Sequence, residues 1–241
     1  MNTQQTLEQM KYLKLNGMAD SYEVQLGMPA HNQLEAHDLV AHLTQAEKLY
    51  RENSRMESLL KNAKLRFNAP PKTIVCSAER NLSKNTWTLL MEGNYLEEGA
   101  SIIITGATGT GKSWLACSLG YQACMMGVKV RYFSMHRLIE SILIAKTEGS
   151  YVKLLNQLEK IPLIILDDFG LQNLNKQTKL ALLQIIEDRY EKKSIIVTAQ
   201  LPVSDWHSYL DDPALADAFC DRLTAKSHRI ELKGPSRRTK K

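Results

Sequence analysis

An eight-residue loop, Gly106–Ser113, has the residue types that bind a nucleoside triphosphate, and it fits the pattern G-x-x-x-x-G-K-[ST]. Glycines let the backbone curl so that successive N–H groups face phosphate oxygens. The lysine of such a loop reaches the β- and γ-phosphates, and the next hydroxyl coordinates magnesium. We therefore expect ATP and magnesium to be bound here, with a tryptophan packing against the sheet or the adenine: Gly106, Ala107, Thr108, Gly109, Thr110, Gly111, Lys112, Ser113 and Trp114.

The segments on either side of this loop have the order that the motif requires. The apolar run SIIIT precedes it, and the helical run WLACSLGYQACMMG follows it. A helix that begins at the loop adds the favourable end of its dipole to the binding of an anion. A glycine-rich turn without a ligand is the alternative, and it would not need this order.

Two acidic residues, Asp167 and Asp168, follow the apolar run LIIL, 55 residues after Lys112. A buried parallel strand that ends in a carboxylate delivers it to the sheet edge where ligands bind. Asp167 is then placed to hold magnesium, directly or through water, and Asp168 to orient or deprotonate the attacking water. Acidic residues are also common at the ends of strands without any function. The presence of the nucleotide loop in the same chain favours a role in catalysis for this pair.

A further apolar run, SIIVT, ends at Thr198 and is followed by Ala199 and Gln200. A polar side chain at this strand end would lie beside the γ-phosphate and the attacking water. Either Thr198 or Gln200 suits that role, and an ordinary strand terminus is the alternative.

After residue 100, short runs rich in Ile, Val and Leu alternate with segments of helix length. Most of these runs lack a polar alternation, which is typical of strands buried on both faces. This order predicts an α/β fold with a parallel sheet covered by helices on both sides. The expected strands are Ile102–Thr105, Val128–Phe133, Leu163–Leu166, Ile195–Thr198 and His228–Leu232.

The first 66 residues have helical periodicity instead. A first run ends at Gly17, a second covers Met18–Leu26, and Asn32 with Glu35 forms a plausible capping box for a long third helix. Pro70-Pro71 would end this part, so we expect an all-helical domain over residues 1–68 and an ATPase domain over residues 69–241. One face of the long helix and its end carries basic residues that could contact DNA: Lys48, Arg51, Arg55, Lys61 and Lys64.

The composition of the 241 residues limits the classes of protein. Hydrophobic residues make up 44% and charged residues 24%, as in ordinary globular chains. No apolar run approaches the roughly 18 to 20 residues of a membrane helix, and residues 1–17 lack an apolar signal core, so we expect no membrane and a cytoplasmic protein. Residues 222–241 carry eight basic side chains against Glu231 alone, which suits a polyanionic partner or a solvated chain end.

Four stretches together resemble the IstB family of insertion-sequence ATP-binding proteins, relatives of the DnaC helicase loaders within the AAA+ ATPases. The first three are HLTQAEKLYRENSRMESLLKNAKL, GATGTGKSWLA and LIILDDFG. The fourth is IIVTAQLPVSDWHSYLDDPALADAFCDRLTAKSHRIELKGPSRR. The resemblance implies a three-layer AAA+ core with a five-stranded parallel sheet, preceded by a small helical domain.

The resemblance also implies roles for two arginines. Arg222 matches the arginine finger that reaches the γ-phosphate in a neighbouring subunit, although a surface Asp–Arg pair is the alternative. Arg238 matches the arginine of a closing G-x-S-x-R pattern that senses nucleotide, but Arg237 stands where an aromatic residue is more usual.

Two departures from the AAA+ pattern affect the expected activity. Asp168 stands where most AAA+ proteins have glutamate, and its shorter side chain predicts slow intrinsic ATP hydrolysis. We also expect this activity to depend on magnesium and to be stimulated by DNA or a partner. Only nine residues follow Leu232, too few for the usual helical lid, so we expect a lidless form closed by neighbouring subunits.

By this resemblance, the protein would form a homo-oligomer on double-stranded DNA with little sequence preference, and would recruit a transposase. The long helix could equally be an oligomer interface with solvated charges. Three other functions remain open: a DnaC-like replicative helicase loader, a P-loop kinase for a small molecule, and a DNA-binding protein whose nucleotide loop is a relic.

Overall fold

Five short apolar runs pair into one parallel sheet in the computed structural model of the chain, which describes residues 2–237. The strand order is β2-β3-β4-β1-β5, and every pairing is parallel. This confirms the α/β fold and all five expected strands. Their bounds are β1 Ser101–Gly106, β2 Val130–Ser134, β3 Leu163–Phe169, β4 Ser194–Ala199 and β5 Ser227–Leu232.

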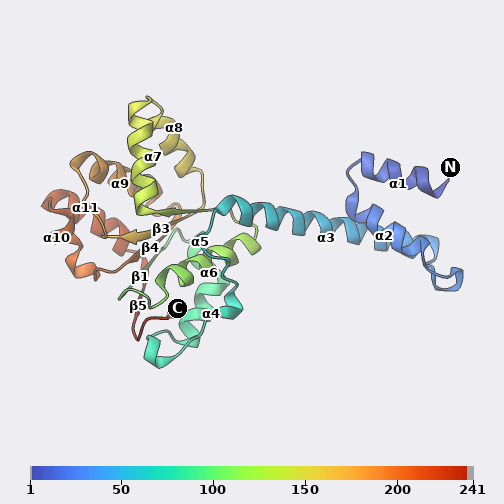
Figure 1. The fold of residues 1–241 in the computed structure, drawn as a ribbon, viewed down its shortest axis with the longest axis horizontal. Coiled ribbons are helices and arrows are strands. Elements are labelled where there is room, and N and C mark those ends of the chain that lie inside the picture. Colours follow the sequence, from blue (N-terminus) through green and yellow to red (C-terminus); the bar gives the residue numbers. More distant parts are fainter. Residues whose placement is uncertain (1, 238–241) are drawn as a thin grey trace. The chain divides into compact units, whose positions relative to one another are not determined.

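Helices cover both faces of this sheet, because alternate strand residues point to opposite sides. Ile103, Ile164 and Val197 belong to one buried cluster with α7–α11, and Ile102, Ile165 and Ile196 to the other with α4–α6. Figure 1 shows the resulting three layers. The helices are α4 Lys84–Glu92, α5 Asn94–Glu97, α6 Lys112–Met125, α7 Met135–Thr147, α8 Tyr151–Glu159, α9 Lys176–Arg189, α10 Trp206–Leu210 and α11 Pro213–Thr224.

The strand order places the candidate residues at one edge. β1 lies between β4 and β5, and β4 lies beside β3. The carboxyl ends of β1, β3 and β4 are therefore neighbours, and the expected nucleotide loop, acidic pair and polar residue follow these three ends. Parallel α/β sheets bind ligands at this edge, where the strand order reverses.

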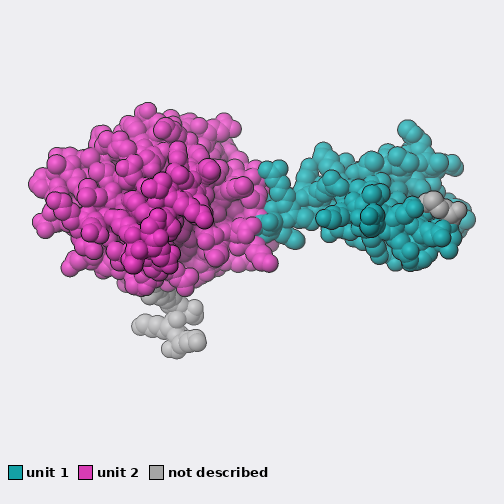
Figure 2. Space-filling view, turned by 90° about the horizontal axis from the view of Figure 1, so that it is seen from above, with its two compact units in different colours: residues 1–58 teal, residues 59–241 magenta. Residues whose placement is uncertain are grey.

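The chain divides into two compact units at Ser58–Leu59 (Figure 2). The boundary lies inside a helix, α3 Ala36–Ala63, whereas we expected the helical domain to extend to residue 68. The last turn of α3 and the residues after it pack with the sheet: Ala63 is fully buried there, and Leu59, Leu60 and Leu65 pack against the same cluster.

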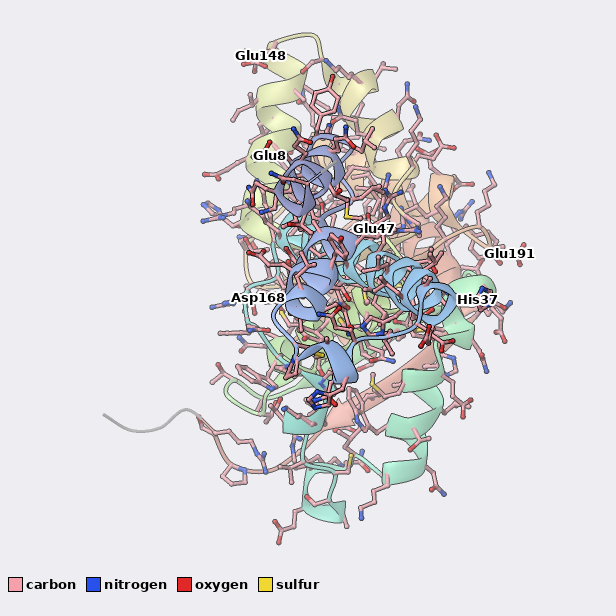
Figure 3. The ribbon with its side chains drawn as sticks, turned by 90° about the vertical axis from the view of Figure 1, so that its right-hand side faces the viewer. Glu8, His37, Glu47, Glu148, Asp168 and Glu191 are labelled. Atoms are coloured by element: carbon pink, nitrogen blue, oxygen red, sulfur yellow. The ribbon has the colours of Figure 1, made fainter. Side chains whose placement is uncertain are left out.

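The first unit consists of α1 Thr3–Tyr12, α2 Asn16–Leu26 and most of α3. Our expectation that Gly17 breaks a helix is wrong: it lies in the first turn of α2, and a Cβ there would lie 2.5 Å from Tyr50 Cβ. α2 therefore approaches α3 at a residue without a side chain. Glu47 of α3, labelled in Figure 3, is buried beside this contact and accepts a hydrogen bond from Met18 N–H.

The expected capping box of Asn32 and Glu35 is also wrong. Asn32 ends a short 3-10 turn, Ala30–Asn32, which begins after Pro29. Gln33 is extended, and α3 begins only at Ala36. The fixed backbone of Pro29 favours the turn, which uses residues that would otherwise begin the helix.

The described residues after β5, 233–237, form no helix and run beside the nucleotide loop. Lys233 N–H donates to Arg80 O at 3.1 Å, and Arg237 N–H donates to Gly109 O at 2.9 Å. Among residues 2–237, no helix combines the length and apolar character that a membrane crossing requires.

Candidate nucleotide site

The loop between β1 and α6 has a backbone that its glycines alone adopt easily. Gly106, Gly109 and Gly111 have φ values of 144°, 81° and 97°. At Gly106 a Cβ would collide with Leu232 O of β5, and at Gly109 with the Ser236 side chain. The loop therefore packs closely against the segment that follows β5, and it leads into α6, which begins at Lys112.

Lys112 lies across the loop that precedes it. Its Nζ donates to Gly106 O at 2.8 Å and to Ala107 O at 2.9 Å. Thr110 Oγ1 also donates to Ala107 O, at 2.9 Å. These bonds hold the loop in a closed curve with the lysine ammonium against it, a geometry that suits binding of a polyphosphate.

The acidic pair at the end of β3 accepts hydrogen bonds from residues of three other segments. Asp167 is fully buried and accepts from Thr198 Oγ1 at 2.5 Å, from Tyr132 OH at 2.5 Å and from Arg66 Nη1 at 3.3 Å. Arg66 Nη1 also donates to Asp168 Oδ2 at 3.2 Å. Asp168, labelled in Figure 3, has a positive φ of 66° at an irregularity in the β3–β4 pairing.

The two carboxylates have different surroundings, as expected for successive residues of a strand. Asp167 is enclosed, whereas the side chain of Asp168 is 31% exposed and lines a cavity of about 490 Å³. Asp168 N–H donates to Thr198 Oγ1 at 3.0 Å, which fixes the backbone at this point. The structure therefore offers one enclosed carboxylate and one that faces the cavity.

The charges around the pair alter two pKa values. Burial lowers the pKa of Arg66, but the neighbouring Tyr132 hydroxyl and Asp167 carboxylate outweigh it and raise that pKa above its ordinary value. Burial and the hydrogen bond to Asp167 both raise the pKa of Tyr132. Tyr132 therefore remains a protonated donor to Asp167 at neutral pH.

The cavity is lined both by residues of the nucleotide loop and by aromatic side chains. Thr108, Gly109, Gly111, Lys112 and Ser113 line it, together with Ile74, Phe67 and Trp114. The ring centroid of Phe67 lies 5.4 Å from that of Trp114. Trp114 Nε1–H donates to Thr73 Oγ1 at 3.1 Å, which fixes the indole. A flat base could stack on these aromatic side chains while its phosphates reach the loop.

Gln200 and Thr198, the two alternatives for a polar residue beside the γ-phosphate, have different positions. Gln200 is exposed and lines the cavity. Thr198 is fully buried behind the acidic pair, to which its hydroxyl is bonded. Gln200 is thus accessible to a ligand in the cavity, and Thr198 contacts the acids instead.

Two more arginines, Arg80 and Arg237, line the cavity. Arg80 is 6% exposed and donates from Nη2 to Thr110 O at 3.2 Å. This hydrogen bond stabilises the conformation of the loop. Burial and the charge of Arg237 lower the pKa of Arg80. Arg237 itself lines the cavity, whereas Arg238, the arginine we expected to sense nucleotide, lies outside the described residues.

The structure does not bring Arg222 to the loop. Arg222, on α11, forms an ion pair with Glu187 of α9 and donates from Nη1 to Ala218 O at 3.0 Å. It lines a small pocket with Ser101 and Ile195, at the beginnings of β1 and β4. The nucleotide loop follows the other end of β1, about 16 Å away at ~3.3 Å per strand residue.

The basic residues expected to contact DNA are exposed in both units. Lys48, Arg51 and Arg55 lie on the first unit's part of α3, and Lys61 and Lys64 lie in the second unit. Arg51 Nε is 2.6 Å from Glu47 Oε1, yet its side chain remains 62% exposed. This ion pair therefore leaves Arg51 accessible to a phosphate.

Magnesium fits the oxygen donors at this site. Ser113 and Asp168 line the cavity, and the enclosed Asp167 carboxylate is joined to Asp168 by the shared contacts of Arg66 and Thr198. Hard oxygen ligands with room for water and phosphate are what magnesium prefers. Because Asp167 is enclosed and does not line the cavity, water-mediated contact suits it better than direct coordination.

Together, the sheet order, the loop and the acidic pair define a P-loop protein of the AAA+ class. The crystal structure of the DnaC helicase loader aligns with 71% of this chain and 100% of its own length, at 23% identity and a TM-score of 0.57. AMPPCP-bound DnaA from Aquifex aeolicus aligns with 70% of this chain and 51% of its own, at 20% identity and a TM-score of 0.58. These similarities establish the fold.

The chain belongs to the family described as IstB-like ATP binding protein, whose pattern matches residues 8–241. An insertion sequence ATP-binding protein of Sinorhizobium fredii, y4pL, is 37% identical over 233 residues, which cover 97% of this chain and 95% of that protein. The ATP-binding protein of insertion sequence IS1162 from Pseudomonas fluorescens is 38% identical over 205 residues, covering 85% and 89%. The expected family is thereby confirmed.

Proposed function

We propose that this protein is a magnesium-dependent ATPase that assembles on double-stranded DNA and recruits a transposase to it. The observation that carries the proposal is the distance between the nucleotide cavity and Arg222 within one chain. The loop, Asp168 and Gln200 share one cavity, while Arg222 lies at the opposite edge of the same sheet. Such a site is completed by the arginine of another copy.

The chemistry within one chain follows from the cavity. The loop N–H groups and Lys112 bind the phosphates, and Phe67 and Trp114 pack against the base. Ser113, with Asp167 through water, would hold magnesium, which would neutralise charge on the phosphates. Asp168, the acid that faces the cavity, orients the attacking water and accepts its proton. Gln200 lies on the same side and can hydrogen-bond that water or the γ-phosphate.

Assembly would depend on the nucleotide because two copies contact it. Arg222 of one copy stabilises the charge that develops on the γ-phosphate bound by the next copy. A ligand that bridges an interface stabilises the assembled state by mass action. Hydrolysis removes the bridging phosphate, and the contact between the copies weakens.

DNA binding would use Lys48, Arg51, Arg55, Lys61 and Lys64, with the basic segment after β5. Contacts from lysine and arginine to phosphates give an affinity that depends on salt and little on sequence. The family membership favours a transposase as the protein partner, since the relatives are named for insertion sequences. A replicative helicase is the alternative partner, and affinity capture with each purified partner separates the two.

Phosphate release from ATP, measured with and without duplex DNA, tests the activity. We expect slow magnesium-dependent turnover in the wild type, an increase with DNA, and loss of both in Asp168→Asn. The double variant Lys48→Gln/Arg55→Gln should keep the basal rate and lose the increase. Phosphorylation of a small metabolite without DNA, or absence of turnover under every condition, would contradict the proposal.

A further inference from the structure

Arg66 contacts both acidic residues through a single nitrogen, and no sequence motif includes it. Arg66 Nη1 lies 3.3 Å from Asp167 Oδ2 and 3.2 Å from Asp168 Oδ2. Two adjacent carboxylates repel one another, and the enclosed one needs a cationic or hydrogen-bonding partner. The guanidinium thus supplies positive charge at the point where the proposed function requires magnesium.

The backbone around Arg66 is anchored, but its side chain has room to move. Ala63 is fully buried at the end of α3, and a Cβ on Gly120 of α6 would lie 3.0 Å from Leu65 Cδ2. In contrast, the Arg66 side chain is 44% exposed, lines the cavity and lies 5.3 Å from the Phe67 ring centroid. Its guanidinium can therefore leave the acids without disturbing the core.

We propose that Arg66 is a displaceable counter-cation that occupies the acidic pair until magnesium arrives with ATP. This inference rests on the proposed function, because it assigns a role toward the metal of that site. The pair has a net charge of −2 when both acids are ionised, and a divalent cation beside Asp167 neutralises it without Arg66. The two cations repel at short distance, so binding of one weakens binding of the other.

Because Arg66 and magnesium compete for the acidic pair, the protein needs a higher magnesium concentration than it would need without Arg66. Arg66 stabilises the pair when no metal is bound, and it must move away from Asp167 when the metal binds. Removal of the guanidinium should therefore make magnesium bind more easily, whereas a residue that only supports the fold would leave the magnesium dependence unchanged. An arginine that binds phosphate instead would be needed for ATP affinity with or without magnesium.

The test is the binding of a fluorescent ATP analogue at increasing magnesium concentrations, with an EDTA control. In Arg66→Gln we expect half-maximal binding at a magnesium concentration about two- to fivefold lower than in the wild type, as an ion pair of ~0.4–1 kcal/mol implies. Lys129→Gln, which removes the same charge from an exposed lysine before β2, should leave the dependence unchanged. Arg66→Lys, which keeps the charge, should lie between wild type and Arg66→Gln.

A second readout needs no nucleotide. Magnesium alone should raise the melting temperature of Arg66→Gln more than that of the wild type, because the acids that lack the guanidinium attract the hydrated ion more strongly. Equal magnesium dependence in the two proteins, or a higher requirement in Arg66→Gln, would overturn the inference. Loss of analogue binding in Arg66→Gln with EDTA as well as with magnesium would assign Arg66 to phosphate instead. If the wild type binds no ATP analogue, the proposed function fails, which is a separate result.

Discussion

Thr198 Oγ1 donates a hydrogen bond to Asp167 Oδ1 at 2.5 Å and accepts one from Asp168 N–H at 3.0 Å. One hydroxyl on β4 therefore fixes the orientation of the enclosed acid and the backbone of the exposed one. This gives Thr198 a positioning role and leaves Gln200, which lines the cavity, as the side chain that can contact the γ-phosphate.

Replacing Thr198 by valine should impair hydrolysis far more than nucleotide binding. The change keeps the shape but removes the donor to Asp167 and the acceptor for Asp168, so we expect the free energy of unfolding to fall by about 1–3 kcal/mol. Displacement of the acids should lower turnover by about 10- to 100-fold. Thr198→Ser, which keeps the hydroxyl, is the matched control, and equal turnover in the two variants would contradict this role.

The length of the acid at position 168 should limit the rate of hydrolysis. Asp168→Glu extends the carboxylate by one methylene toward the cavity, and we expect turnover that is unchanged or higher. Asp168→Asn should lower turnover by about 100-fold or more, because it removes the base. Steady-state phosphate release measures both variants, and a clear fall in Asp168→Glu would refute the explanation for slow hydrolysis.

Close packing of the nucleotide loop against residue 236 should make Gly109 sensitive to substitution. Gly109→Ala places a Cβ at a φ of 81° and against the Ser236 side chain, so we expect ATP affinity to fall by about tenfold or more. Gly149→Ala is the matched control, since it has a φ of 70° and no atom within 4 Å of the added Cβ. Titration calorimetry should show weakened ATP binding in the first variant alone.

Arg222 should act on the nucleotide of another copy. Arg222→Ala leaves the cavity intact, so ATP affinity should stay within about twofold of the wild type, while DNA-stimulated turnover falls by roughly a thousandfold, as for other arginine fingers. The Arg222 side chain is 27% exposed in its pair with Glu187, and loss of this half-buried pair should cost about 1 kcal/mol of stability.

Mixing two inactive variants distinguishes action between copies from action within one. Arg222→Ala supplies an intact loop, and Lys112→Ala supplies an intact Arg222, so their mixture should recover part of the turnover. A mixture as inactive as its components would count against the shared site.

Much of the second unit could be predicted from the sequence. β1, β3 and β4 are apolar runs without alternation, which is the pattern of a buried parallel sheet. The loop and the acidic pair each follow such a run, so their positions at the carboxyl edge of the sheet could be expected from the parallel arrangement. The function of the exposed face of α3 could not be predicted from its charge, because basic residues on a helix suit a solvated interface as well as DNA.

Contacts between distant segments were beyond prediction. Arg66 is 101 residues from Asp167, and Tyr132 is 35 residues from it, and neither belongs to a motif. In the sequence, Arg66 is only one of several basic residues near the end of α3, and nothing distinguishes it from the others. The division inside α3 was missed for a similar reason, since the periodicity of a continuous helix does not show where its packing partner changes.

Sedimentation of the wild type and of Lys112→Ala with duplex DNA tests the central claim most directly, with ATP, ADP or no nucleotide present. Our account predicts a large complex only when wild-type protein, ATP and DNA are combined, and small species in every other mixture. A wild type that remains small in all mixtures would contradict nucleotide-dependent assembly. A large complex formed equally by Lys112→Ala would assign the assembly to DNA alone.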